Sequence, residues 1–561
     1  MRLARAASIA ARISGGESTD LREGNRLGFW KTDEGSDGGA VIRKLIAGFD
    51  RVDGWTAARA DLIAFLVVLL GLALRFWVAS RFYLNPDEAF HCSLANADSF
   101  EQLLDQALIS THPPLLIFIL HVVKQVSVAE LWLRVAPVVS GALAPWILYR
   151  WMAPRWGRAG GLFTLVVLSL SPMLIGLATQ LRGYTLAIFL AAAALYCLEL
   201  AIERGSVRWM AAFGAFLLLG IAAEYVTAWF ALAAGLYFLS RWREETLTPA
   251  VRAVWVAPQL AGLSVFGWLL VAQILDVRAK MKTSEFMKVA LNDFFPSPGE
   301  SALSFIAEGT YGQFAYLIPS VFTVIACMML YAAAVVFLVA GRTRRSLALA
   351  VFLVAPFVAG CVASFTRFYP YGMTRQTSLL VIFIAVGAGI AAGRVLRSRV
   401  LLAVPLAVLF VPLWHLDRYA DWANIPAGRS QREKMVAAID FYRSAIPAGA
   451  LIVTDAETHR LLRFYLHPHD RVTPKVEFGT DEILADRRVF SNRWRFESLD
   501  DLDEDVRRAK DLYPEAAAGI WVLDAGWSVF LGERATAVEE RFGGELVSDF
   551  GGAVYVFRMA P

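Results

Sequence analysis

The chain has 561 residues, of which 57% are hydrophobic and 19% are charged, and its formal net charge at pH 7 is +4. A soluble protein could not bury that much apolar side chain, so the composition excludes a purely soluble domain. The small net charge, with arginines clustered between apolar runs, argues against a nucleic-acid partner and is typical of a mainly α-helical, polytopic membrane protein.

Residues 1–58 are rich in Gly, Ser and Arg and lack a long apolar core, so we expect a flexible cytoplasmic tail and no signal peptide. The apolar runs that follow are long enough to cross a bilayer. They lie at about 60–80, 131–149, 159–178, 184–202, 208–222, 225–240, 251–275, 316–340, 346–365, 376–393 and 400–416. These runs predict about eleven transmembrane helices within a membrane module at 59–416.

The arginine clusters set the predicted orientation, because Lys and Arg concentrate in cytoplasmic loops. The count depends on segment 113–127, which is apolar but short, begins with two prolines and contains Lys124. If this segment is interfacial or re-entrant and does not cross, every Arg-rich loop falls on the side of the N-terminus. These loops are 150–158, 203–208, 241–252, 341–345 and 394–399. We therefore expect a cytoplasmic N-terminus and an external C-terminus.

Two further regions lie on the predicted external side. The loop at 276–315 mixes charged and apolar residues, and the sequence leaves open whether it moves over a site or only connects two spans. Residues 417–561 are predicted to form a small soluble α/β domain with an accessory or acceptor-binding role, since they contain no nucleotide-binding Gly-rich loop and no catalytic constellation. Its predicted elements are strands at 450–454, 519–523 and 553–558 and helices at 456–466 and 501–510.

The adjacent carboxylates Asp87 and Glu88 follow the first predicted span directly, in the run Asn85-Pro86-Asp87-Glu88-Ala89. At the boundary between membrane and water they would reach a lipid-borne headgroup. A carboxylate is ionised at neutral pH and can therefore accept a proton. The alternative is that the pair only marks a helix end that faces solvent.

Three arginines stand where membrane proteins seldom place them. Arg75 lies near the end of the first predicted span, where its side chain either faces the bundle or snorkels to water. Arg182, two residues before Tyr184, and Arg375, in the turn Tyr-Gly-Met-Thr-Arg, lie where helices meet the external face. Guanidinium groups suit a phosphate because their fork of donors binds it bidentately and stays charged. The pattern predicts an anion site beneath the outer leaflet.

Two histidines lie on the same side as the acidic pair. His112 precedes two prolines at the predicted start of the helix in 113–127. His91 stands three residues after Glu88, so a divalent metal site with these two ligands can be drawn, although the spacing matches no strong metal signature.

The acidic pair, the His-Pro-Pro-Leu run, the Arg-Gly-Tyr run and the Tyr-Gly-Met-Thr-Arg turn, in this order, resemble the GT-C membrane glycosyltransferases. The resemblance covers about 60–416 and is closest to the branch similar to protein O-mannosyltransferases and lipid A aminoarabinose transferases. It implies a bacterial inner-membrane enzyme with a GT-C-like fold. The donor would be a sugar on polyprenyl phosphate, and the acceptor an envelope glycolipid, polysaccharide or protein on the external face, where the C-terminal domain would be periplasmic.

The resemblance also implies roles for the residues. Asp87 would be the general base, and Glu88 would assist it or hold a metal. Arg182 and Arg375 would bind the donor phosphate, and His112 would orient the loop or help the phosphate to leave. Tyr184 and Arg75 complete the predicted phosphate-binding set.

Two other functions remain open from the sequence. A transporter or flippase of lipid-linked sugars would also use arginines near the membrane, although such a path should carry charged groups at mid-span. A structural or assembly subunit would carry the acidic pair without using it. Replacing Asp87 by Asn separates an enzyme from a structural subunit, because an enzyme should lose turnover while still binding the donor and a structural subunit should be unaffected.

Overall fold

The computed structural model describes residues 58–110, 112–275, 294–317, 320–395, 431–469, 480–527 and 529–559. The predicted tail up to residue 57, the predicted last span at 400–416 and residues 276–293 of the predicted loop lie outside this set.

The first part of the described chain is helical. Its elements are α3 (Ala60–Arg81), α4 (Pro86–Leu94), α5 (Phe100–Ile109), α6 (Leu115–Lys124), α7 (Glu130–Leu133), α8 (Val135–Leu170), α9 (Pro172–Ala178), α10 (Tyr184–Arg204), α11 (Val207–Ala223), α12 (Thr227–Ser240), α13 (Pro249–Leu269), η1 (Leu270–Ile274), α16 (Ala302–Leu317), α17 (Val321–Ala340), α18 (Arg344–Phe365), η2 (Arg375–Leu380) and α19 (Val381–Val395). Helix α8 leaves the helical conformation at Trp156 and at Gly157, whose φ of 84° favours glycine, and this break separates two of the predicted spans.

Within the described residues, six helices are long and apolar enough to cross a membrane, or seven if α8 and α9, bent by 56°, form one span. All predicted spans up to 376–393 coincide with helices. However, α11 and α12 have only 17 and 14 residues, fewer than the roughly 20 that a bilayer requires. The protein is thus a helical membrane protein, while the count of about eleven spans stays a prediction.

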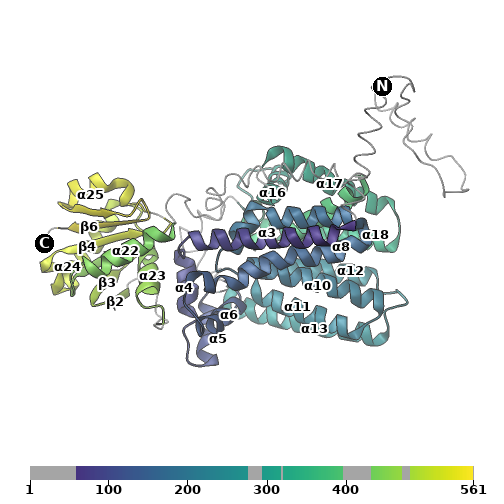
Figure 1. The fold of residues 1–561 in the computed structure, drawn as a ribbon, viewed down its shortest axis with the longest axis horizontal. Coiled ribbons are helices and arrows are strands. Elements are labelled where there is room, and N and C mark those ends of the chain that lie inside the picture. Colours follow the sequence, from purple (N-terminus) through teal and green to yellow (C-terminus); the bar gives the residue numbers. More distant parts are fainter. Residues whose placement is uncertain are drawn as a thin grey trace, which may run out of the picture. The chain divides into compact units, whose positions relative to one another are not determined.

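Helices α3, α8, α10, α11 and α13 lie alongside one another in the bundle (Figure 1). The contact between α8 and α19 is made by glycines: a Cβ atom added to Gly160 would lie 2.5 Å from the carbonyl oxygen of Gly389. Small residues permit this close approach of the two backbones. Inside a membrane, where the hydrophobic effect does not drive helices together, the resulting van der Waals contacts stabilise the helix pair.

The structure can be compared with the prediction for two segments outside the predicted spans, 113–127 and 276–315. Helix α6 has only 10 residues, about 15 Å of rise, and is therefore too short to be a twelfth crossing. The predicted loop at 276–315 is in part helical, because α16 begins at Ala302. Helix α16 buries Phe305 and Phe314 and donates from Gln313 to Thr377 at 2.8 Å, so packing against η2 rather than local polarity decides its conformation.

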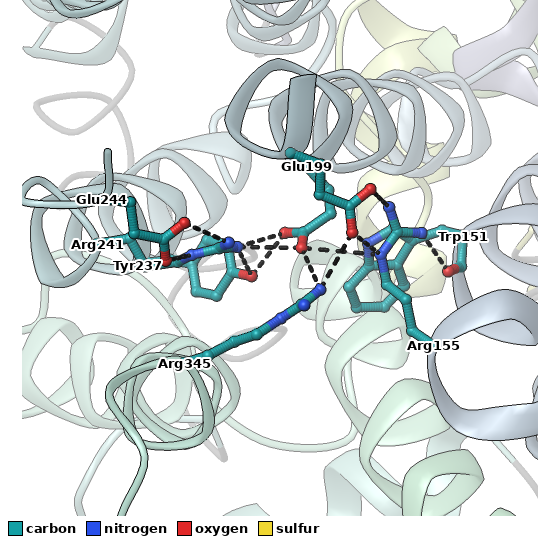
Figure 2. Close-up of polar contacts among 8 residues, drawn as sticks. Trp151, Arg155, Glu199, Tyr237, Arg241, Glu244 and Arg345 are labelled. Atoms are coloured by element: carbon teal, nitrogen blue, oxygen red, sulfur yellow. Dashed lines mark hydrogen bonds and ion pairs between the residues drawn. The ribbon is translucent and has the colours of Figure 1, made fainter. Parts of the chain in front are cut away.

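A charged network, here called the Glu199 network, joins α8, α10, α12 and α18 at one end of the bundle (Figure 2). It consists of Arg155, Glu199, Glu203, Tyr237, Arg241, Glu244 and Arg345. Glu199 is fully buried and accepts hydrogen bonds from Arg241 at 2.9 Å, Arg345 at 2.7 Å and Tyr237 at 2.6 Å. Four of the predicted cytoplasmic segments therefore lie at the same end, and which end faces the cytoplasm stays a prediction.

The C-terminal part forms an α/β domain around a six-stranded sheet of order β2-β3-β1-β4-β6-β5 (Figure 1). Strand β1 runs parallel to β3 and β4, and the other neighbours are antiparallel. The elements are α22 (Arg432–Ser444), β1 (Leu451–Thr454), α23 (Ala456–Leu466), β2 (Thr480–Leu484), β3 (Arg487–Ser491), α24 (Leu499–Leu512), η5 (Pro514–Ala518), β4 (Ile520–Ala525), η6 (Gly532–Arg534), α25 (Ala535–Phe542), β5 (Glu545–Asp549) and β6 (Val554–Met559). The predicted helices and strands coincide with α23, α24, β1, β4 and β6.

Candidate functional site

Helix α4 directs the two adjacent carboxylates in different directions. Pro86 occupies its first turn, and Asn85 and Glu88 form a capping box: Asn85 accepts from the Glu88 N–H at 3.0 Å and Glu88 accepts from the Asn85 N–H at 2.7 Å. Glu88 is therefore drawn back into the protein, where it also accepts from the backbone N–H of Leu181 at 2.7 Å. Asp87 is left free to face the residues that follow α9.

Asp87 is surrounded by three guanidinium groups, and these four residues are called the site cluster. Arg182 donates to Asp87 Oδ2. Arg375 at the start of η2 lies 4.0 Å from the same oxygen, and Arg460 of α23 lies 3.9 Å from Oδ1. The Asp87 side chain is 21% exposed and the Arg182 side chain 3%. The site cluster thus gathers more positive than negative charge in a partly buried place.

Arg182 is held in place by His112, which is itself held by Glu224. Arg182 donates to His112 Nε2 at 2.8 Å, and because a guanidinium has no acceptor, His112 carries its proton on Nδ1 and donates to Glu224 at 3.1 Å. Gln273, in the π-helical turn η1, donates to the backbone carbonyl of His112 at 2.9 Å. The Tyr184 ring contacts the His112 ring, and among the described residues its buried hydroxyl has no hydrogen-bond partner.

The guanidiniums decide the charge of the site. Burial by itself would raise the pKa of Asp87, but Arg182, Arg375 and Arg460 outweigh burial and hold this pKa below its ordinary value. Burial lowers the pKa of His91 well below its ordinary value, and Arg182 lowers it further. Asp87 is therefore an anion, and His91 is uncharged, at neutral pH.

Arg75 lies inside the bundle with backbone partners. It is fully buried and donates to the carbonyls of Gly71 at 2.9 Å and Ser169 at 2.8 Å. These bonds join α3 to the end of α8, where the helix dipole favours a cation. The structure gives no contact between Arg75 and the site cluster.

The residues proposed for a metal are engaged in other contacts. Both Glu88 oxygens accept hydrogen bonds, and Arg134 lies 3.2 Å from one of them. His91 donates from Nδ1 to the carbonyl of Leu181 at 2.9 Å. Within the described ranges, no three His, Cys, Asp or Glu side chains are grouped to hold a metal ion. Glu88 and His91 would have to leave these contacts to bind a metal ion.

The turn that carries Arg375 adjoins an apolar groove between α12, α17 and α18. The groove has a volume of about 750 Å³, and its lining includes Trp229, Val358 and Phe368. Trp229 packs against Tyr369, whose hydroxyl donates to the carbonyl of Gln376 at 3.0 Å. One end of the groove therefore lies beside the segment that positions Arg375.

Sequence reasoning missed three residues of this region. Glu224 was visible as a carboxylate in a very short turn between two apolar runs. Arg134 lay inside a predicted span, yet it is buried and donates to the carbonyl of Phe82 at 2.7 Å, after the end of α3. Arg460 gave no signal, because only the fold brings α23 to α4.

Comparisons with known proteins found one matching family model and several similar solved structures. Residues 111–268 match a family model described as dolichyl-phosphate-mannose-protein mannosyltransferase. No curated protein matches the chain. A crystal structure of ArnT from Cupriavidus metallidurans bound to undecaprenyl phosphate is 16% identical and covers 90% of this chain and 100% of its own, with a TM-score of 0.47. Archaeal oligosaccharyltransferase AglB from Archaeoglobus fulgidus, in complex with an inhibitory peptide and a dolichol-phosphate, is 13% identical and covers 90% of this chain and 74% of its own, with a TM-score of 0.47.

The family match includes Arg182 of the site cluster and the two residues that hold it in place, His112 and Glu224. It covers part of the membrane module and none of the C-terminal domain. The resemblance to protein O-mannosyltransferases, which the sequence motifs predicted, is confirmed over residues 111–268.

Proposed function

We propose that this protein transfers a sugar from a polyprenyl-phosphate donor to a hydroxyl group of an acceptor on the external face of the membrane. The observation that carries the proposal is the site cluster, in which Asp87 stands among the guanidiniums of Arg182 and Arg375. The sequence predicts that this cluster lies at the membrane boundary. The match to a family named for a dolichyl-phosphate-linked donor supports the same donor class.

The chemistry follows from these groups. Asp87 would take the proton of the acceptor hydroxyl while its oxygen attacks the anomeric carbon of the donor sugar. The bond between that carbon and the phosphate oxygen would break, and polyprenyl phosphate would leave as an anion. Arg182 and Arg375 would stabilise the charge that develops on the leaving phosphate, and His112 would hold Arg182 in place.

The apolar groove offers a place for the lipid part of the donor. A polyprenyl chain is apolar and long, so it should lie along a membrane-facing groove while its phosphate reaches the boundary. The groove between α12, α17 and α18 has this character, and its Phe368 end adjoins the turn that carries Arg375. We propose that the polyprenyl chain lies there.

Mass spectrometry of envelope glycolipids, polysaccharides and glycoproteins tests the proposal. Cells with the wild-type chain should contain a sugar modification that is missing in cells with Asp87→Asn, provided that both proteins are present in equal amounts. A flippase of lipid-linked sugars would tolerate the substitution, because translocation needs no base. Identical envelope profiles from the two strains would therefore refute the transferase.

A further inference from the structure

The C-terminal domain contributes one side chain to the site cluster. Arg460 stands on α23, and its guanidinium lies 3.9 Å from Asp87 Oδ1, which is an ion-pair distance but too long for a hydrogen bond. Arg182 and Arg375 approach the other oxygen, Oδ2. Asp87 therefore stands between two guanidiniums of the membrane module and one of the C-terminal domain.

The surroundings of Arg460 fix the plane of its guanidinium. The group lies over the Phe90 ring of α4, 4.2 Å from its centroid, and over the Trp494 ring, 4.3 Å from its centroid. Contact with these two aromatic rings restricts the orientation of the planar fork and shields it from water. The side chain is only 15% exposed.

The guanidinium of Arg460 has N–H groups that donate to no described residue. Its Nε, for example, is buried and has no hydrogen-bond partner among the described residues. The neighbouring arginine Arg495 differs, because it donates to Glu457 at 3.1 Å within the domain. A buried guanidinium with unused donors is costly unless a ligand accepts from it.

We propose that Arg460 is a binding residue that the C-terminal domain supplies to the membrane site, and that its ligand is the phosphate of the polyprenyl-phosphate donor. This inference rests on the proposed function. One anion of phosphate size has enough oxygens to accept from three guanidiniums, and it would compete with Asp87 for all of them. Donor binding then depends on the C-terminal domain and releases Asp87 to act as base.

Binding of polyprenyl phosphate without a sugar, measured with the full-length protein in lipid nanodiscs, tests the inference. Arg460→Met should weaken binding about tenfold, as expected for a lost charge-assisted contact. Arg460→Lys keeps the charge without the fork and should lie between Arg460→Met and the wild type. Arg507→Met, an exposed substitution on α24, is the matched control and should bind as the wild type does.

A second control separates binding from docking of the domain. Tyr465 donates to Glu130 and accepts from the backbone N–H of Leu84 at 3.0 Å, so Tyr465→Phe weakens the same interface without removing the guanidinium. It should leave the affinity unchanged. An equal loss in Tyr465→Phe and Arg460→Met would show that Arg460 acts only by docking the domain, and the inference would be wrong.

The remaining outcomes distinguish this inference from the proposed function. If Arg460→Met binds like the wild type while Arg182→Met does not, Arg460 is no ligand and the transferase proposal stands. If the wild-type protein itself fails to bind polyprenyl phosphate, the proposed function is wrong. An unfolded Arg460→Met protein would shift the decision to Arg460→Lys, where wild-type affinity would contradict the inference.

Discussion

The two ends of the helical bundle each hold a cluster of arginines, but the clusters differ in their charge balance. In the Glu199 network three arginines meet three glutamates, and Glu199 accepts several hydrogen bonds at 2.6–3.0 Å. In the site cluster three arginines surround Asp87, and two of them stay 3.9–4.0 Å away. The first arrangement is complete within the protein, whereas the second retains positive charge for a ligand.

The difference teaches how to read buried arginines in a membrane protein. A buried ion pair with all its hydrogen bonds satisfied holds helices together, and removing one partner leaves a charge that is costly to bury. A cluster with excess charge at a membrane boundary contributes less to stability and more to recognition of anions. Substitutions in the two clusters should therefore have opposite effects on stability and activity.

The largest effect is expected from Asp87→Asn. Loss of a general base typically lowers a rate by about 10²–10⁴-fold, so transfer from a polyprenyl-phosphate sugar should become undetectable or nearly so. Binding of polyprenyl phosphate should persist, because the variant removes a competing anion from the guanidiniums. Asp105→Asn, on the exposed face of α5, is the control for transfer. Normal transfer by Asp87→Asn would show that Asp87 is not the general base and that the site cluster is not catalytic.

The next test sets Arg182→Met against Arg241→Met. Arg182→Met should weaken binding of polyprenyl phosphate about 10–100-fold, since it removes a charge-assisted donor. Arg241→Met leaves Glu199 buried with fewer partners and should cost about 3–5 kcal/mol of stability. Thermal unfolding in nanodiscs and a binding titration of both variants measure the two effects. If both variants lose stability equally and binding equally, the proposed division between a stabilising Glu199 network and an anion-binding site cluster is wrong.

A smaller effect is expected from filling the apolar groove. Val358 lines the groove and is 56% exposed, so Val358→Trp should fold and obstruct the proposed path of the polyprenyl chain. We expect about threefold to tenfold weaker binding of long-chain polyprenyl phosphate, as for the loss of one or two buried methylene groups. A phosphate on a short isoprenoid chain should bind the variant and the wild type alike. Equal loss for both chain lengths would place the lipid elsewhere.

The smallest effect concerns a carboxylate that has no guanidinium to lower its pKa. Burial raises the pKa of Asp524 in β4 to about 7, while its Oδ2 accepts from the backbone N–H of Leu531 at 2.8 Å. Because the folded pKa lies above the unfolded one, stability is lost as pH rises through about 7. Asp524→Asn should therefore raise the unfolding temperature relative to wild type, by more at pH 8 than at pH 5. If the difference in unfolding temperature between Asp524→Asn and the wild type is the same at both pH values, the raised pKa of Asp524 is not its cause.

The contribution of Asp87 to stability depends on pH in the opposite direction from that of Asp524. The folded pKa of Asp87 is lowered, so its contribution to stability is present above its unfolded pKa near 4 and is lost as pH falls below that value. Between pH 5 and 8 Asp87 should therefore add no pH dependence to transfer. A change in the transfer rate of the wild-type protein centred between pH 5 and 8 and lost in Asp87→Asn would contradict this assignment.

Much of the site was visible in the sequence because membrane proteins seldom place charge near apolar runs. Asp87, Arg182 and Arg375 were found in this way, and the structure brings them together. The same logic did not reveal the partners of Arg75 and Glu88, because a single sequence does not tell whether a polar side chain meets a ligand or a backbone group. The Asn85 to Glu88 capping box was a local signal that the acidic pair would split.

Hydropathy and arginine spacing determined the membrane class, the places of the helices and the shared side of the Arg-rich loops, because each depends on residues close in sequence. Short apolar runs likewise predicted the buried strands β1 and β4, and the residue pattern of 456–466 predicted the helix α23. Only the tertiary structure decided that α16 is a helix, that η2 aims Arg375 at Asp87, and that α23 adds Arg460. These outcomes depend on contacts between segments far apart in the chain, and no local preference encodes such contacts.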